Sequence, residues 1–194
     1  MFGLKRKIVW LARIGHCRGF GVQSPWAYMI VRYVINEHYP YYAYEPLARA
    51  YPCKDTVTRK LRELCLRVSN HVQPRTVMAI GCTDSAVGAY VKAGCKSAYY
   101  QETGCEEVIG KPVNAGFAVI YPCQGSREAF KSVAKDAGDG VVVMLMGIHE
   151  DRKMRQLWRE VTAELRGVVS FDLYYCGLVF FDKKRFKQNY IINF

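Results

Sequence analysis

The chain has 194 residues, of which 51% are hydrophobic and 23% are charged, a composition typical of globular proteins and unlike disordered or fibrous ones. This length suits one well-buried domain and is short for two. The apolar runs, such as 141–146 and 177–181, fall far short of the roughly 20 residues that a membrane-spanning helix requires. The composition therefore predicts a single globular unit without a transmembrane segment.

The net charge of +11 is concentrated near the N-terminus. Residues 1–75 hold 13 Lys and Arg against 4 Asp and Glu, whereas residues 76–194 hold 15 against 13. Such an asymmetry is typical of a surface that meets nucleic acid, anionic lipid or another polyanion. It is equally compatible with a solvated helical surface that has no charged partner, and the partner stays unknown at this point.

The N-terminal residues and the cysteines both favour a cytoplasmic location. The apolar stretch that begins at Ile8 is interrupted by Arg13 and lacks a small-residue cleavage site, so it does not have the pattern of a secretory signal. The 8 cysteines include no Cys-x-x-Cys pair, and the nearest two are ten residues apart. We therefore expect free structural thiols and no zinc site.

Residues 1–74 are predicted to form a helical N-terminal leader that packs on the core. A helix over 24–37 begins with a serine cap and a proline at the first helical position. A tyrosine-rich turn follows at 38–44. A second helix is predicted over 55–70, with its apolar residues facing inward and its basic residues largely on the outer side.

From residue 75 onward, strands and helices alternate, which is the pattern of a parallel sheet with covering helices. We expect helices at 84–93, 126–137 and 151–165, and strands at 76–81, 97–102, 116–121, 140–146, 168–174, 178–182 and 187–193. A turn at 175–177 makes two of these strands an antiparallel hairpin. Residues 75–194 are therefore predicted to be a Rossmann-like α/β domain, in one globular unit with the leader.

The most informative motif is the turn at residues 80–88, Ile-Gly-Cys-Thr-Asp-Ser-Ala-Val-Gly. It lies between a buried strand and a helix, which is the position of a nucleotide-binding loop. Such a loop carries several glycines, so that its backbone bends tightly and approaches the ligand closely. Only Gly81 and Gly88 remain here, so the motif indicates the fold better than the activity.

Two further segments carry a family resemblance. They are residues 18–26, Arg-Gly-Phe-Gly-Val-Gln-Ser-Pro-Trp, and residues 170–181, Ser-Phe-Asp-Leu-Tyr-Tyr-Cys-Gly-Leu-Val-Phe-Phe. Together with the order of the elements, they resemble the class I S-adenosylmethionine-dependent methyltransferases, and within these an uncharacterised methyltransferase-like group of Bacteroidetes. The resemblance implies a Rossmann-like sheet with helices on both faces and a C-terminal antiparallel hairpin. It also implies that one edge strand-helix unit is missing after Glu102.

The resemblance implies S-adenosylmethionine as the cofactor and Gly81, Thr83, Ser85 and Glu102 as the residues that bind it. The first loop of the family reads acidic-x-Gly-x-Gly-x-Gly. Here Ala79 stands at the acidic position, and Thr83 and Ser85 stand at the second and third glycines. Their side chains take volume where the methionine and ribose portions would lie. Glu102 matches the acidic residue that holds the ribose hydroxyls.

The same comparison implies that no catalytic metal is bound. Related O-methyltransferases that use a divalent cation bind it with acidic residues after the fourth and fifth strands, and Pro122–Cys123 and Met146–Gly147 stand there instead. His149 is either a general base, since an unperturbed imidazole titrates near pH 6.5, or the start of the last helix beside the capping Glu150–Asp151 pair. No catalytic residue is assigned.

Three functions follow from these observations. The first is a degenerate methyltransferase-like protein, a pseudoenzyme with weak or no catalysis that acts by binding a partner. The second is an active S-adenosylmethionine-dependent methyltransferase that acts on a small molecule or on RNA. The third is a basic adaptor that binds nucleic acid or an anionic membrane. The simultaneous losses favour the first; they are at Ala79, Thr83, Ser85, Pro122 and Met146.

Overall fold

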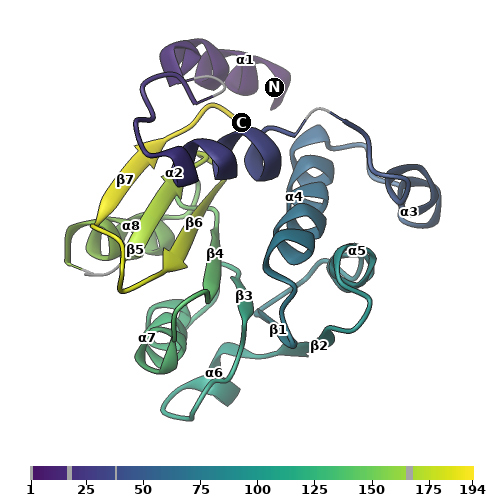
Figure 1. Ribbon diagram of the computed structural model, residues 1–194. Helices are drawn as coiled ribbons and strands as arrows, with labels where there is room; N and C mark the ends of the chain where they lie inside the picture. Colours follow the sequence, from purple (N-terminus) through teal and green to yellow (C-terminus); the bar gives the residue numbers. More distant parts are fainter. Residues whose placement is uncertain (1, 17–18, 38, 165–167) are drawn as a thin grey trace.

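The computed structural model describes residues 2–16, 19–37, 39–164 and 168–194. A seven-stranded sheet lies between two layers of helices (Figure 1). The strands are β1 Thr76–Ile80, β2 Tyr99–Thr103, β3 Phe117–Ile120, β4 Val142–Met146, β5 Val168–Asp172, β6 Cys176–Phe181 and β7 Gln188–Ile191. The helices are α1 Phe2–Ala12, η1 Ile14–His16, α2 Pro25–Ile30, the π-helical η2 Val31–Ile35, α3 Tyr44–Ala50, α4 Thr56–Val72, α5 Val87–Gly94, α6 Cys105–Val108, α7 Ser126–Asp136 and α8 Arg152–Glu164.

The strand order is β2-β1-β3-β4-β6-β5-β7, and β6 runs antiparallel to both of its neighbours while the other pairs are parallel. The expected antiparallel hairpin is therefore confirmed as β5 and β6. After β1 the chain pairs β2 on one side and β3 on the other, so a topological switch point lies at the carboxyl end of β1. Ligands of open α/β sheets bind at such points.

The predicted loss of an edge unit is also confirmed. Between β2 and β3, residues 104–116 are fully described and contain only the four-residue helix α6, with no strand. As a result β2 is the edge of the sheet. At the opposite edge, the expected final strand is present as β7, which pairs in parallel with β5.

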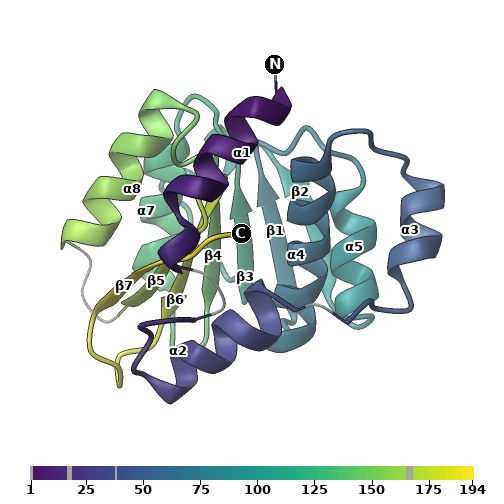
Figure 2. The same cartoon turned by 90° about the horizontal axis from the view of Figure 1, so that it is seen from above.

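The two faces of the sheet bury separate cores because the strand residues alternate in direction. One core joins the sheet to α2, η2, α4 and α5, so residues of the N-terminal leader share it with the strands. The other core joins the sheet to α6, α7 and α8. Figure 2, turned by 90° from Figure 1, shows strands β4, β3 and β1 side by side along their length. None of the helices in the described ranges is long and apolar enough to cross a membrane.

Helix α4 begins and ends where local chemistry dictates. Its cap Asp55 accepts a hydrogen bond from the Thr58 amide at 2.8 Å, which satisfies an otherwise unpaired donor of the first turn. Its C-terminal residue Gln73 adopts a φ of 48°, a left-handed conformation that is common at helix ends. The apolar stripe of α4 then faces the sheet, with Leu64 and Val68 fully buried.

The structure corrects several sequence-based expectations. At the end of the tyrosine-rich segment it adds α3, and the helix expected from residue 84 begins at Val87, after a turn at residues 85–86. Arg67 is not on the outer side of α4: it is buried and donates to the carbonyls of Val34 and Ile35. Those carbonyls belong to the last two residues of η2, where a helix leaves its carbonyls without intrahelical donors, and a guanidinium can satisfy both. Position 38 of the turn, Arg18 of the resemblance and residue 165 of the last helix lie outside the described residues.

Gly94 is where α5 approaches α4 most closely. A Cβ at this position would lie 2.2 Å from the Leu66 carbonyl oxygen and 2.9 Å from the Asn70 amide nitrogen. Both atoms belong to the backbone and cannot rotate away. We therefore expect Gly94→Ala to lower the free energy of unfolding by about 2–3 kcal/mol, as overpacking does.

Urea denaturation measures this change, with Gly138→Ala as the matched control. A Cβ at Gly138 meets nothing within 4 Å, so we expect this variant to stay within about 0.5 kcal/mol of the wild type. Equal stability of the two variants would contradict the close approach of α5 to α4.

Candidate functional site

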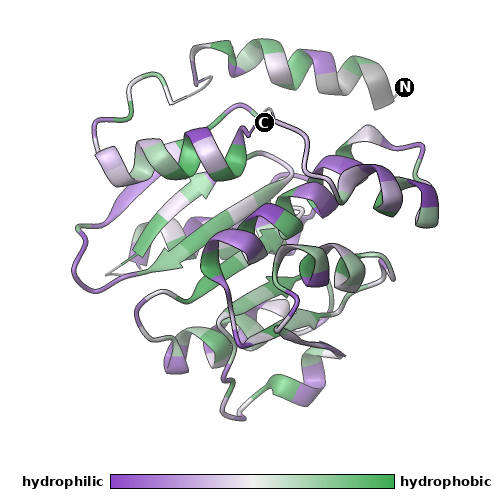
Figure 3. Ribbon diagram, turned by 45° about the vertical axis from the view of Figure 1, so that its right-hand side comes forward, coloured by the Kyte–Doolittle hydropathy of each residue, from purple (hydrophilic) through white to green (hydrophobic). Residues whose placement is uncertain are grey.

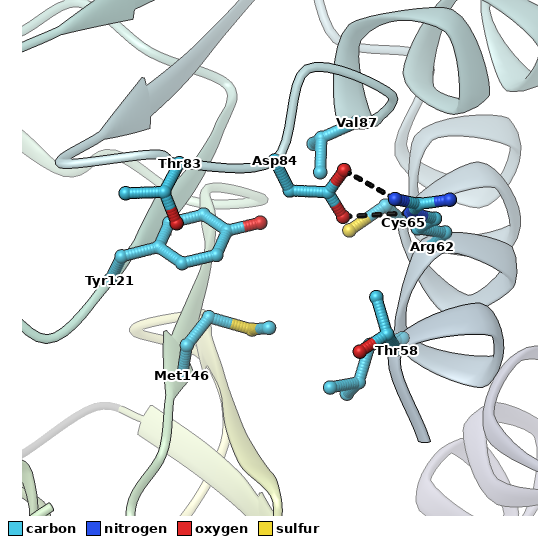
Figure 4. Close-up of a pocket in the computed structure, with 9 residues that line it drawn as sticks. Thr58, Arg62, Cys65, Thr83, Asp84, Val87, Tyr121 and Met146 are labelled. Carbon is cyan, nitrogen blue, oxygen red and sulfur yellow. Dashed lines mark hydrogen bonds and ion pairs between the residues drawn. The ribbon is translucent and has the colours of Figure 1, made fainter. Parts of the chain in front are cut away.

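The candidate site is a pocket of about 310 Å³ at the switch point of the sheet (Figure 4). The loop after β1, the ends of β3 and β4, and one side of α4 surround it. Its lining residues are Thr58, Leu61, Arg62, Cys65, Thr83, Asp84, Val87, Tyr121 and Met146. A pocket therefore lies where the sequence predicts a nucleotide site, and the binding of a nucleotide there stays a prediction.

The loop after β1 turns sharply at Gly81. This glycine has a φ of 66°, and its amide donates to the Thr103 carbonyl of the neighbouring strand at 2.8 Å. A Cβ here would lie 3.0 Å from Sγ of Cys123, so both the conformation and the space favour glycine. The turn then runs to Ala86, whose amide donates to Asp84 at 3.1 Å.

Asp84 is bound across the pocket by α4. Arg62 donates from Nε to Oδ2 and from Nη2 to Oδ1, both at 2.7 Å, as the dashed lines in Figure 4 show. The side chains are 13% and 17% exposed, so solvent screens the pair only in part. The hydrogen bonds that Arg62 donates to Asp84 raise the pKa of Arg62 above its ordinary value. This two-point contact fixes both groups and ties the β1–α5 loop to α4.

The rest of the pocket wall is apolar or neutral. Burial raises the pKa of the Tyr121 phenol, and it raises that of the Cys65 thiol to about 12. Burial also raises the pKa of Cys82, beside the pocket. These groups therefore stay protonated at neutral pH, and a protonated thiol is a poor nucleophile. Tyr121, Cys65 and Met146 shape the pocket rather than supply reactive groups.

The structure brings only part of the predicted cofactor set to this pocket. Thr83 lines it, and Gly81 forms the turn that leads to it. Ser85 is exposed on the same turn and is not among the lining residues. Glu102 is exposed at the end of β2, outside the lining, and its Oε1 accepts a hydrogen bond from the Tyr100 hydroxyl at 2.9 Å. The cofactor role of these four residues stays a prediction.

The expectation that all cysteines are free is wrong for two of them. Cys105, at the start of α6, and Cys123, after β3, form a disulfide. Both follow strands that flank β1, and the sheet brings their loops together although 18 residues separate them in sequence. Five cysteines are free in the described chain, at 53, 65, 82, 95 and 176, and Cys17 lies outside it. Among the described residues, no group of three or more His, Cys, Asp or Glu is arranged to hold a metal ion.

A second polar cluster lies at the carboxyl ends of β4 and β5. Asp172 Oδ2 accepts from His149 Nε2 at 2.7 Å, and its Oδ1 pairs with Arg13 Nη1 at 2.8 Å. The His149 ring stacks on Tyr174, with centroids 5.1 Å apart. His149 precedes α8, and Asp151 caps that helix by accepting from the Met154 amide at 2.9 Å. The cluster joins the end of α1 to the sheet.

Sequence reasoning missed the residues that organise both places. Arg62 and Asp84 are 22 positions apart, and Arg13 and Asp172 are 159 apart, so no local pattern pairs them. One signal was present: Asp84 lies inside the nucleotide-loop motif, where the sequence predicts small residues. A charged side chain at this position predicts a partner on a neighbouring element, because a partly buried charge is costly without one.

Comparison with known proteins supports the fold. No family model and no curated protein matches the sequence. The SAH-bound methyltransferase PaMTH1 of Podospora anserina superposes on 82% of this chain and 97% of that chain, with a TM-score of 0.55 and 7% sequence identity. Cofactor-bound Rv0187 from MTB has a TM-score of 0.48 and 12% identity over 71% of this chain and 87% of its own. The O-methyltransferase from Bacillus cereus in complex with SAH has a TM-score of 0.48 and 12% identity, over 76% of this chain and 94% of its own.

At such low identity a structural match shows the fold and nothing finer. The match to PaMTH1 and the strand order together give this chain the Rossmann-like fold of the class I S-adenosylmethionine-dependent methyltransferases. The fold class implied by the resemblance is thereby confirmed.

Removal of Arg62 tests the pair in the pocket. We expect Arg62→Met to lower the free energy of unfolding by about 2–3 kcal/mol, because Asp84 is then left partly buried without its partner. Arg59→Met, three residues earlier on α4, is the control. Arg59 is 52% exposed and 3.9 Å from Glu63, so its loss should cost less than about 0.5 kcal/mol. Chemical denaturation of both variants decides the point, and equal costs would contradict it.

Asp172 predicts a pH dependence of stability. Burial alone would raise the pKa of Asp172, but hydrogen bonds from Arg13 and His149 outweigh it and hold that pKa below its ordinary value. The Asp172 carboxylate therefore stabilises the folded protein fully above the pKa that this group has in the unfolded chain, about 4. This stabilisation is lost as the pH falls through the lower pKa of Asp172 in the folded protein. We expect Asp172→Asn to be less stable than the wild type at pH 6.

The difference between Asp172→Asn and the wild type should shrink at pH 3. Denaturation curves at the two pH values measure it. Glu106→Gln, at an exposed carboxyl, serves as the control and should follow the wild type at both. A difference for Asp172→Asn that stays constant between pH 6 and pH 3 would show that the carboxylate charge is not what stabilises the cluster.

Proposed function

We propose that this chain is a methyltransferase-like protein in which S-adenosylmethionine binding is weak or absent and catalysis is lost, so that it acts by binding a partner. The observation that carries the proposal is the Arg62–Asp84 pair in the wall of the switch-point pocket. Kinship with the Bacteroidetes group belongs to the same proposal and is supported by segments 18–26 and 170–181. A cytoplasmic location is part of the same proposal: five of the described cysteines are free, and two, Cys105 and Cys123, form a disulfide.

The residues present do not fit the cofactor. S-adenosylmethionine carries an ammonium group, a sulfonium and a ribose diol, and such groups need free carboxylates or other acceptors when they leave water. Of the nine residues that line the pocket, all within the described ranges, Asp84 alone is acidic. Both of its oxygens already accept from Arg62. A ligand that bound Asp84 would compete with Arg62 for the carboxylate, and weakening this partly buried ion pair opposes binding.

The acceptor expected for the ribose is also badly placed. Glu102 is exposed, lies outside the pocket lining and is engaged by Tyr100. The Tyr100 ring packs against Gly88, where a Cβ would lie 2.6 Å from it, so Tyr100 is held in place. At the ends of β3 and β4, Tyr121 and Met146 offer no carboxylate. These contacts support a pocket that lies where a cofactor site would be but offers no free carboxylate.

Thermal unfolding with excess S-adenosylmethionine and, separately, SAH tests the proposal. A ligand at 100 times its dissociation constant adds about 2.7 kcal/mol, which raises the midpoint by roughly 5–11 °C for a chain of this size. We expect the midpoint to shift by less than about 1 °C at 5 mM of either compound, because a ligand that barely binds adds little to the free energy of unfolding. A shift of several degrees that saturates at micromolar cofactor would contradict the proposal and favour an active methyltransferase.

A further inference from the structure

Helix α1 carries an apolar stripe that nothing in the described chain covers. Leu4, Ile8 and Leu11, here called the α1 stripe, are 66%, 57% and 60% exposed. Their spacing of four and three residues puts them on one face of the helix. Ile14, in η1, continues the line at 55% exposed. Exposed apolar residues are ordinary when scattered, but a contiguous row of this kind marks an interaction surface.

The C-terminal end of α1 is fastened to the protein, and the three side chains of the stripe are exposed. Arg13, directly after the helix, pairs with Asp172 and donates to its carbonyl at 3.0 Å. The Asn193 side chain donates to the Trp10 carbonyl at 3.1 Å, and the Asn193 amide donates to the His16 carbonyl at 3.0 Å. In Figures 1 and 3, α1 is the outermost helix and lies beyond α2 and the C-terminus. Figure 3 shows hydrophobic and hydrophilic ribbon alternating along it.

The charge around the stripe has one sign. Before Glu37, the chain contains six Lys and Arg and no Asp or Glu. Three of the six are consecutive, at residues 5–7, inside α1. A helix that carries both a short apolar row and basic residues combines the two signals that hold a peripheral helix on a membrane, burial of apolar side chains and attraction to acidic headgroups.

We propose that α1 is an interfacial anchor that lays the α1 stripe into the headgroup region of an anionic lipid bilayer. Aliphatic side chains at the stripe favour lipid over nucleic acid, because bases stack on aromatic or guanidinium planes and gain nothing from Leu or Ile. The charge favours lipid over a second copy of the chain, because two copies that each carry a net charge of +11 repel one another at this basic end. The anchor is independent of whether the switch-point pocket binds a cofactor.

Liposome flotation tests the anchor with the full chain. The probes are vesicles of phosphatidylcholine alone and vesicles with 30% phosphatidylserine. We expect binding to be about tenfold tighter on the anionic vesicles and to weaken strongly between 0.05 M and 0.5 M salt, because acidic headgroups supply the attraction. Equal binding to both vesicles, or none to either, would overturn the proposal.

Two variants separate the stripe from the charge. Leu4→Ser/Ile8→Ser/Leu11→Ser should lose at least about tenfold in vesicle affinity, because it removes the apolar contact with the bilayer. Its thermal midpoint should be unchanged, since the three side chains are exposed. Phe186→Ser, at a side chain that is 90% exposed and far from α1 in sequence, is the control and should float like the wild type. Lys7→Glu should weaken binding to the anionic vesicles and leave binding to the neutral vesicles unchanged, because it removes attraction to acidic headgroups. Lys111→Glu should weaken binding to neither kind of vesicle.

The alternatives give other results. If the stripe joined two copies, size-exclusion chromatography with light scattering would show a dimer that the triple Ser variant dissolves, and the vesicles would stay free of protein. If the basic end served nucleic acid, the triple Ser variant would bind single-stranded RNA as tightly as the wild type and neither would float. Either pattern would overturn the membrane anchor.

Discussion

The Arg62–Asp84 pair is the contact on which the rest of the site depends. It joins the longest helix of the leader, α4, to the loop that follows the first strand of the sheet. On another part of the same helix, Arg67 closes the end of η2, and the Leu66 carbonyl lies against Gly94 of α5. Helix α4 therefore contacts η2, the loop after β1 and helix α5 at the same time. Because each of these contacts is buried or partly buried, the loop has little freedom to adapt to a ligand.

This constraint separates the fold of the chain from the chemistry of its pocket. The strand order and the turn at Gly81 place a ligand crevice where the methyltransferase fold has one. The side chains then line that crevice with an internal ion pair, a half-buried phenol and a thioether. A fold and a site change independently in this way, since core packing preserves the fold while a few side chains decide the chemistry. The role that we propose for such a molecule is binding, and the exposed α1 stripe is the surface that we propose for it.

Patterns in the sequence predicted the sheet well and the contacts of the site poorly. Strands β3, β4 and β6 are short apolar runs that are fully buried, and Asp55 is an ordinary cap, so both follow from local rules. Arg67 was expected outside because a helical pattern shows only which face is polar. Its long side chain instead reaches unpaired carbonyls on an element some 30 positions earlier. Asp172 and Arg13 meet only because the two ends of the chain lie together, which no spacing reveals.

The most direct test of the central claim is a crystal structure of the protein grown and soaked with 5 mM S-adenosylmethionine. The account predicts that Arg62 still holds both oxygens of Asp84 and that no density for an adenosyl group lies between α4 and the loop after β1. Density for the cofactor in that pocket, with Arg62 turned away from Asp84 or with Glu102 on the ribose, would contradict it.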